Sequence, residues 1–367
     1  MSTAATLSAL IAEADFNLRW FDLGRRLRPV SRAEAEAFES GAAPWPHPYL
    51  RHAWTGLLLW PKEGGEPIVW FLRLPLDEQG KLQLPVRDGF LRRLDEALRA
   101  SGNGQPRCGG QSQRVQPSAE ALDQALQTSG LLYEPAPERQ ATFHARSSLL
   151  LKRPASSHYT RALAYLENPQ DMAWEQLALQ GIADLAARWQ EHRDLLERRM
   201  NDLAPPVFIS LCQCLESETI DHRIAGAIAA RGRRAIAGNL AAETAEETGN
   251  HAEVTAAIRG LSHSVAQGLR RQFLNEVLQS AAATDGEVLA AIGSRCADEL
   301  EDSALTSAWL ASLAKSQSQS TFNLLLTDLM YLAPVRTSIL TAVRDPQRPE
   351  SVAGAFGKFL HGGDPVH

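Results

Sequence analysis

One stretch, residues 53–80, constrains the fold more than any other part of the chain. It reads AWTGLLLW, then PKEGGEP, then IVWFLRLPLDEQG, so a glycine-containing segment between two prolines separates two apolar runs. Alternate positions of each run point to opposite faces of a strand, and both sets are largely apolar. A strand that is apolar on both faces usually lies in the centre of its sheet. The stretch therefore predicts two strands, at 53–60 and 68–74, in a covered sheet.

The segments around this pair predict an N-terminal α+β domain with a mainly antiparallel sheet and flanking helices. The expected further strands are 17–22, 26–30, 81–86 and, returning later to the sheet, 141–152. The expected helices are 3–15, 31–38, 87–100 and 118–129. Ser31 and Glu34 have the spacing of a capping box at the second of these helices. Residues 101–117 are rich in Gly, Gln and Ser and predict a flexible loop.

The pattern changes after Pro154, where amphipathic segments of about ten to sixteen residues follow one another with short breaks. They predict an all-helical array, in which separate helices are expected at 219–231 and 233–247. The boundary is placed at 153–157, which gives an α+β domain at 1–153 and an all-helical domain at 154–367. A HEAT-like solenoid and a compact helical bundle both fit the helical half.

Charge and composition narrow the classes of partner. The formal net charge is -6, and arginine pairs stand beside acidic neighbours, so nucleic-acid binding is unlikely. No run of about 18 uncharged apolar residues occurs, which argues against a membrane span. The four cysteines, at 108, 212, 214 and 296, are too scattered for a disulfide framework. We therefore expect a cytoplasmic protein.

The usual signatures of chemistry are absent from the sequence. It holds no C-x-x-C, H-E-x-x-H, G-x-S-x-G or phosphate-binding glycine loop. Cys212 and Cys214 are two positions apart on a predicted helix, so their side chains point in different directions and do not chelate one ion. The sequence accordingly assigns no catalytic, cofactor-binding or metal-binding residue, and no cofactor is expected.

The proline-rich segment PWPHPY at 44–49 is a candidate interaction surface. Three prolines restrict its backbone, so little entropy remains to be lost on binding. Trp45 and Tyr49 are residue types enriched at binding hot spots, and His47 lies between them. The alternative is that the two aromatic rings pack the loop onto its own sheet.

Two further groups of residues are weaker candidates. Asp22, Arg25 and Arg26 surround one turn, which is either an anion-binding site or a turn whose charges neutralise one another. A cleft at the domain junction is the other candidate, and the alternative there is a set of hydrogen-bonded interface side chains. The residues expected in that cleft are His144, His158 and Tyr159.

Several motifs together carry a family resemblance. They are WFDLGRR at 20–26, PWPHPY at 44–49, AWTGLLLW at 53–60, IVWFLRLPLDEQG at 68–80, and FHA at 143–145 followed by SHY at 157–159. In these motifs the chain resembles a domain-of-unknown-function family of gamma-proteobacterial proteins, over nearly its whole length. The resemblance implies a bacterial cytoplasmic protein and assigns no functional residue.

We interpret the chain as a non-enzymatic interaction protein, a scaffold or adaptor that offers a helical-array surface to a protein partner. The sequence identifies neither that partner nor the oligomeric state. The alternative is an enzyme of unknown class with its site at the junction of the two domains. A cleft that collects His144, His158 and an acidic residue within hydrogen-bond reach would favour the enzyme.

Overall fold

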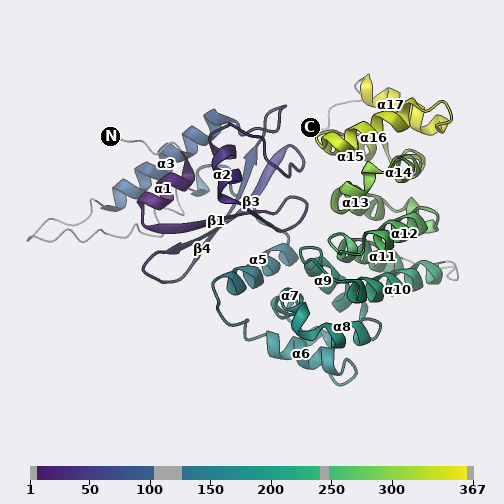
Figure 1. The fold of residues 1–367 in the computed structure, drawn as a ribbon, viewed down its shortest axis with the longest axis horizontal. Helices are drawn as coiled ribbons and strands as arrows, with labels where there is room; N and C mark the ends of the chain where they lie inside the picture. Colours follow the sequence, from purple (N-terminus) through teal and green to yellow (C-terminus); the bar gives the residue numbers. More distant parts are fainter. Residues whose placement is uncertain (1–5, 103–125, 240–247, 362–367) are drawn as a thin grey trace, which may run out of the picture. The chain divides into compact units, whose positions relative to one another are not determined.

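A computed structural model of the protein describes residues 6–102, 126–239 and 248–361. The chain divides into two compact units, Met1–Pro135 and Ala136–His367. The first contains an antiparallel sheet with flanking helices and the second is a helical array, which confirms the predicted α+β fold class (Figure 1). Most of the expected loop at 101–117 and most of the expected helix at 118–129 fall outside the described residues.

The N-terminal unit is built on a four-stranded antiparallel sheet with the order β2-β1-β3-β4. Its described elements are, in chain order, α1 (Leu7–Glu13), β1 (Phe16–Asp22), β2 (Arg28–Val30), α2 (Arg32–Glu39), β3 (His52–Pro61), β4 (Ile68–Pro75) and α3 (Leu84–Gly102). The strand β3 lies between β1 and β4, so the prediction of a central strand at 53–60 is confirmed. Its partner strand at 68–74 is confirmed as β4.

The core of this unit lies between one face of the sheet and the helices α1, α2 and α3, which lie on the same side of it (Figure 1). Every second residue of each strand points toward these helices, as the strand period requires. The buried side chains of this core include Trp20, Leu57, Trp70, Leu72, Phe38, Phe90, Leu94 and Trp45. Ser31 and Glu34 form the predicted capping box at the start of α2.

The strand predicted at 81–86 is wrong. Leu82 makes only an isolated bridge with Leu76, and the helix α3 begins at Leu84. Pro85 stands in the first turn of this helix. Proline fits there because the first helical N–H groups have no partner within the helix, so a missing donor costs little.

The C-terminal unit contains helices throughout its described part. They are α5 (Pro137–Leu150), α6 (Tyr159–Glu167), α7 (Leu179–Ala187), α8 (Arg193–Arg199), α9 (Pro205–Leu215), α10 (His222–Asn239), α11 (Thr248–Leu261), α12 (Gln267–Leu278), α13 (Gly286–Arg295), α14 (Ser303–Ser316), α15 (Gln319–Leu329), α16 (Ala333–Arg344) and α17 (Glu350–Leu360). Short 3₁₀ turns join some of them, at Trp174–Gln176, Trp189–His192, Ala281–Thr284 and Ala297–Glu301.

These helices stack in two layers. In one layer α6, α8, α10, α12, α14 and α16 contact one another in succession, and in the other α5, α7, α9, α11, α13, α15 and α17 do the same. Figure 1 shows the progression from the teal helices to the yellow ones. A single apolar core, which runs from Ala141 to Val352, fills the space between the layers. Successive helices along the chain therefore extend the array in one direction, and each helix packs mainly against its neighbours in the stack.

The strand predicted at 141–152 is also wrong, because most of this segment belongs to α5. Pro137 occupies the first turn of α5, where proline favours a helix start. Arg139, Thr142 and Arg146 recur at helical spacing, and both arginines bind glutamates at the end of α9. The division of the chain before Ala136 therefore precedes the boundary expected after residue 153, since the helix α5 belongs to the second unit.

The break expected between 231 and 233 does not occur, and α10 continues through Gly232. A Cβ atom at this position would lie 2.5 Å from Cζ of Phe273 on α12 and 2.8 Å from Cβ of Ala257 on α11. Gly232 therefore allows close packing of three helices instead of ending one of them.

Candidate functional site

The proline-rich loop at 44–49 is anchored by Trp45, which is 2% exposed. Its ring packs 4.8 Å from that of Phe38, and its indole Nε1 donates a hydrogen bond of 3.1 Å to Asp22 Oδ1. The backbone N–H of Trp45 also donates to Gly80 O at 2.8 Å. A side chain held in this way offers no surface to a partner, so the prediction of Trp45 as a contact residue is wrong. The burial of this ring agrees with the alternative expected for the loop, in which the ring packs onto its own sheet.

His47 and Tyr49 lie nearer the surface and are half-buried. Burial and the neighbouring Arg28 lower the pKa of His47 to about 4, so its ring is neutral at pH 7. Arg28 Nη1 donates to His47 Nδ1 at 3.3 Å. The ring of Tyr49 lies under the guanidinium of Arg25, with 5.4 Å between the guanidinium carbon and the ring centroid.

The turn that holds Asp22, Arg25 and Arg26 is buried, since all three are less than 9% exposed. Asp22 Oδ1 accepts hydrogen bonds from Gly24 N at 3.3 Å and from Trp45 Nε1, and Arg25 Nε donates to Pro48 O at 3.3 Å. All three residues make further interactions as well. These contacts favour the alternative of a self-neutralised turn that ties β1 to the proline-rich loop.

A tight turn at Tyr49–His52 follows the loop directly. Leu50 and Arg51 both have positive φ, at 47° and 61°, which is the left-handed conformation that asparagine and glycine adopt most readily. Tyr49 and His52 exchange two backbone hydrogen bonds of 3.1 and 3.0 Å across it. His52 Nδ1 donates to Leu50 O at 2.7 Å, and Leu76 N donates to Arg51 O at 3.1 Å. The turn therefore holds two unfavourable backbone conformations in place with four hydrogen bonds.

Aromatic rings gather beside this turn on the sheet. Trp54 packs edge-on against Tyr133 at 4.8 Å between centroids and lies 6.4 Å from the ring of Tyr49. Its Nε1 donates to Tyr49 O at 2.8 Å. The guanidinium carbon of Arg73 lies over the Trp54 ring, 5.6 Å from the centroid. We call Tyr49, Arg51, Trp54, Arg73 and Tyr133 the aromatic–arginine surface.

The three residues expected in a junction cleft all belong to the helical unit. His144 on α5 and His158 before α6 are exposed, and neither imidazole hydrogen-bonds to any residue that the structure describes. Tyr159 instead pairs with His192, with 2.6 Å between the hydroxyl and Nε2, and stacks under Arg188. The structure therefore does not bring His144 and His158 into one hydrogen-bonded group.

A buried ion-pair cluster of the helical unit surrounds Glu216, the residue after α9, whose side chain is 1% exposed. Arg139 Nη2 donates to Oε1 at 3.0 Å, Arg259 Nε donates to Oε2 at 2.7 Å, and Arg295 Nε lies 3.2 Å from Oε2. Burial alone would raise the pKa of Glu216, but the three arginines outweigh it and lower this pKa to about 2. The cluster joins the ends of α5, α9, α11 and α13.

Glu218, two residues further on, has the opposite environment. It is 4% exposed and receives one hydrogen bond, from Arg146 Nη1 to Oε2 at 3.0 Å. Its Oε1 is buried without a hydrogen-bond partner among the described residues. Burial outweighs the attraction of Arg146 and raises the pKa of Glu218 to about 7. Two carboxyl groups of one turn thus differ widely in pKa, which is a pattern found at functional and at structural sites.

The cysteines of the helical unit are buried thiols. Cys212, Cys214 and Cys296 are 0% exposed and form no disulfide. Burial raises the pKa of Cys212 and raises that of Cys214 to about 12, so both stay protonated and unreactive at neutral pH. Within residues 6–102, 126–239 and 248–361, no group of three His, Cys, Asp or Glu side chains is placed to hold a metal ion.

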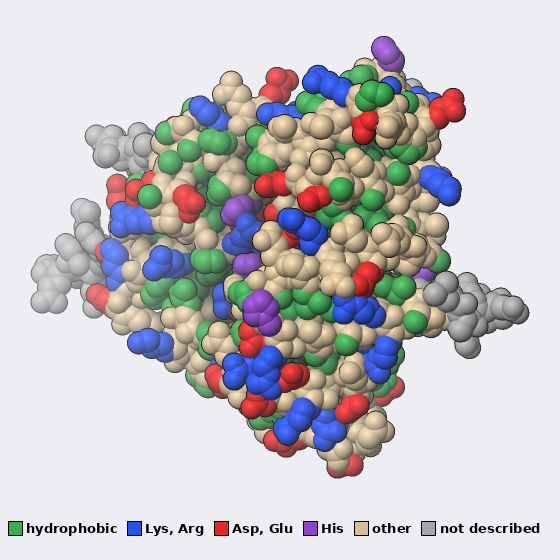
Figure 2. All heavy atoms as spheres, turned by 45° about the vertical axis from the view of Figure 1, so that its right-hand side comes forward, with side chains coloured by type: hydrophobic (Ala, Val, Ile, Leu, Met, Phe, Trp, Pro, Cys, Tyr) green, Lys and Arg blue, Asp and Glu red, His purple; other side chains and the backbone are tan. Residues whose placement is uncertain are grey.

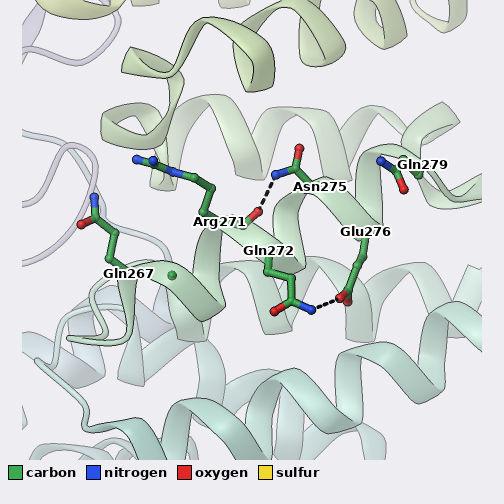
Figure 3. A pocket seen from close by; sticks show the side chains of 7 residues that line it. Gln267, Arg271, Gln272, Asn275, Glu276 and Gln279 are labelled. Carbon is green, nitrogen blue, oxygen red and sulfur yellow. Dashed lines mark hydrogen bonds between the residues drawn. The ribbon is translucent and has the colours of Figure 1, made fainter.

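A groove of about 610 Å³ runs beside α12 (Figure 3). Four of its lining side chains are amides, namely Gln267, Gln272, Asn275 and Gln279. Arg271 and Glu276 complete the polar lining, and Glu276 is also bound by Arg233 of α10 at 2.6 Å. Asn275 Nδ2 donates to Arg271 O at 3.0 Å, and Gln272 Nε2 donates to Glu276 Oε1 at 2.9 Å. These two bonds use the amide nitrogens of Gln272 and Asn275, so the amide oxygens of both side chains stay open to a partner.

The described surface carries both signs of charge. On the face shown in Figure 2, basic and acidic side chains lie interspersed over the described part of the protein. No helix in that part combines the length and the apolar character needed to cross a bilayer. The described features therefore define an α+β protein with a long helical array, two polar or aromatic surfaces and an internal ion-pair network.

Comparison with known proteins gives a family for this architecture. A family model described as "Protein of unknown function (DUF3549)" matches residues 2–360, and the chain belongs to this family. No curated protein and no solved structure matched the chain in the same comparisons.

Sequence reasoning missed three of these features. Leu50 and Arg51 carry none of the Asn-Gly or Asp-Gly signals of a tight hairpin turn, so only the folded backbone reveals it. The partners of Glu216 come from helices far away along the chain, which leaves no local pattern. The amide row of α12 does follow helical spacing in the sequence, and counting its polar positions could have found it.

Proposed function

We propose that this protein is a non-enzymatic scaffold or adaptor of the bacterial cytoplasm, whose HEAT-like helical array holds a protein partner. The observation that carries the proposal is the groove beside α12, which is polar and lined by residues of one helix. Helical arrays of this kind stack their repeats into an extended surface suited to binding another chain.

The chemistry of the groove suits a polypeptide. A side-chain amide offers both a donor and an acceptor, which is the same pair that each peptide group of an extended chain presents. Gln267, Gln272 and Gln279 are exposed, and the amide groups of Gln267 and Gln279 make no hydrogen bond within the described residues. Arg271 and Glu276 supply one charge of each sign for the side chains of the partner.

The frame behind this groove is stiff. Glu299, which is buried, accepts hydrogen bonds from Arg270 Nε at 2.9 Å and from Arg271 Nε at 3.0 Å. Arg233 of α10 binds Glu276 of α12, so neighbouring helices of the layer are tied together. A surface with little freedom to rearrange loses little entropy when a partner binds.

The alternative of an enzyme at the junction draws no support from the residues expected to form its site. His144 and His158 are exposed and are not hydrogen-bonded to each other or to a carboxylate among the described residues. General acid–base chemistry needs such groups within hydrogen-bond reach.

The test is affinity capture of the tagged full chain from its native host, with and without nuclease. We expect a protein partner that survives nuclease treatment and is lost when Gln267, Gln272 and Gln279 are replaced together by Ala. A matched control replaces the exposed amides Gln170 and Gln176 by Ala, which should leave capture unchanged. Retention of the partner by the groove variant, or its loss on nuclease treatment, would contradict the proposal.

A further inference from the structure

The aromatic–arginine surface of the N-terminal unit holds two exposed arginines that lack a carboxylate. Arg51 and Arg73 are exposed, and neither guanidinium hydrogen-bonds or ion-pairs with any residue that the structure describes. Most buried arginines of the helical unit are bound to Glu or Asp, as Arg139 and Arg270 show. The two arginines of this surface therefore keep their full capacity to bind an acidic group.

The guanidinium of Arg73 and the backbone of Arg51 are held in defined places. Arg73 stacks over the ring of Trp54. The two side chains lie next to each other because Trp54 of β3 and Arg73 of β4 are directly paired in the sheet register. Arg51 stands at the tip of the turn with a φ of 61°, a conformation that disfavours any residue with a side chain. Glycine would relieve this strain, yet the position carries an exposed cation. Strain of this kind is a reason to look for a binding role.

The strand positions around Trp54 carry no acidic side chain. The register places Arg19, Asn17 and Phe21 of β1 on the same sheet face as Trp54 of β3 and Arg73 of β4. The one acidic residue of β1, β3 and β4 is Asp22, and its side chain points to the opposite, helix-covered face of the sheet. The charges on this face of the three strands are therefore positive only.

We propose that the aromatic–arginine surface is a docking site for an acidic segment of another protein, in which Asp or Glu alternates with large apolar side chains. Guanidinium groups bind carboxylates through paired hydrogen bonds, and Tyr, Trp and Arg are the residue types that dominate binding energies at interfaces. The rings of Tyr49, Trp54 and Tyr133 receive the apolar side chains of the segment. Arg51 and Arg73 receive its carboxylates.

Charge complementarity favours a polypeptide over a nucleic acid here. Nucleic-acid binding depends on many phosphate contacts, and its affinity grows with their number. This surface and the strand face beside it carry three exposed arginines, Arg51, Arg73 and Arg19, and the whole chain has a net charge of -6. A short acidic and apolar segment needs only a few charge pairs together with ring contacts.

The test measures fluorescence polarisation of a labelled peptide of alternating Glu and Leu or Phe, titrated with the full-length protein. Two further probes are the same peptide with Gln in place of Glu and a single-stranded oligothymidylate. We expect the acidic peptide to bind, to weaken as salt is added, and to lose about tenfold or more in affinity in Arg73→Glu. Arg51→Gly should weaken binding several-fold without lowering the melting temperature.

Arg92→Glu is the matched control, since Arg92 is an exposed arginine on α3 of the same unit and the substitution makes the same charge change. It should bind the acidic peptide as the parent protein does. Equal loss in Arg92→Glu and Arg73→Glu, equal binding of the Gln peptide, absence of acidic-peptide binding, or tighter binding of oligothymidylate would each overturn the proposal.

Discussion

Replacing Glu218 by Gln should stabilise the protein at alkaline pH, although it removes a charged partner of Arg146. The ordinary pKa of a glutamate is 4.5, and in the folded chain burial raises that of Glu218 to about 7. A difference of about 2.5 pKa units corresponds to about 3 kcal/mol of free energy against the ionised form in the folded state. Gln has nearly the same shape, carries no charge and can still accept the hydrogen bond from Arg146.

The pH window follows from the direction of this shift. Below about pH 4.5 Glu218 is protonated in the folded and in the unfolded chain, so it contributes no penalty. Between pH 4.5 and about 7 the unfolded chain releases the proton and the folded chain retains it, so stability falls as pH rises. Above about pH 7 the penalty is complete. Glu218→Gln should therefore match the parent protein near pH 4 and exceed its stability by about 1–3 kcal/mol at pH 8.

The assay is urea unfolding of both proteins at several pH values, followed by far-UV circular dichroism, with the difference between the two free energies plotted against pH. The other titrating groups cancel in this difference. Glu216→Gln is the matched comparison, since the pKa of Glu216 is lowered to about 2. Its carboxylate stabilises the fold above pH 4.5, and its removal leaves Arg139, Arg259 and Arg295 without their shared partner, at a cost of about 3–5 kcal/mol. A pH-independent difference for Glu218→Gln, or a loss of stability at pH 8, would refute the reasoning.

Three further predictions concern stability and are checked by urea unfolding at pH 7. Gly232→Ala should destabilise by about 1–3 kcal/mol because its Cβ would lie 2.5 Å from the ring of Phe273, whereas Gly226→Ala on the same helix, where nothing lies within 4 Å, should stabilise by about 0.5–1 kcal/mol. Trp45→Ala should cost about 3–5 kcal/mol as a buried ring is lost, and a cost below about 1 kcal/mol would show that this ring is exposed. Arg51→Gly should stabilise by about 0.5–1 kcal/mol, since glycine accepts its φ of 61° without strain, and a loss instead would show that the side chain packs.

The parts of the fold that follow from the sequence are those with a strong local pattern. The run at 53–60 is apolar at odd and even positions alike, and the structure indeed places β3 in the centre of the sheet. The capping box at Ser31 was visible because its two residues are three positions apart. The helical half could be predicted because most of its helices show amphipathic spacing and residues typical of helix ends.

The segment at 141–152 shows where local pattern is insufficient. Its run of Leu149, Leu150 and Leu151 after two serines has the composition of a strand end as well as of a helix. The deciding contacts are those of Arg139 and Arg146 with Glu216 and Glu218, which lie more than seventy positions further along the chain. Tertiary contacts of this kind override weak local preference.

The candidate sites were harder to predict than the fold because they depend on which side chains stay exposed and without a partner once the chain has folded. Trp45 and Trp54 both lie in apolar or proline-rich segments of the sequence, but Asp22 and Phe38 enclose the first ring, whereas the second is half-buried with Arg73 stacked on it. No spacing rule distinguishes the two rings, since the difference lies in the burial of their neighbours.

The arginines of this chain differ in role according to whether they bind a buried carboxylate. An arginine that shares a buried carboxylate, as Arg259 shares Glu216, holds helices together, and removing it takes one of three cations away from that buried charge. An exposed arginine stacked on a ring, as Arg73 is on Trp54, adds little to the stability of the fold, because exposed charges interact weakly in water. Charge reversal at Arg73 should therefore change binding with little effect on unfolding, whereas charge removal at Arg259 should change unfolding first. This contrast in the two measurements distinguishes an arginine that binds a partner from one that supports the array.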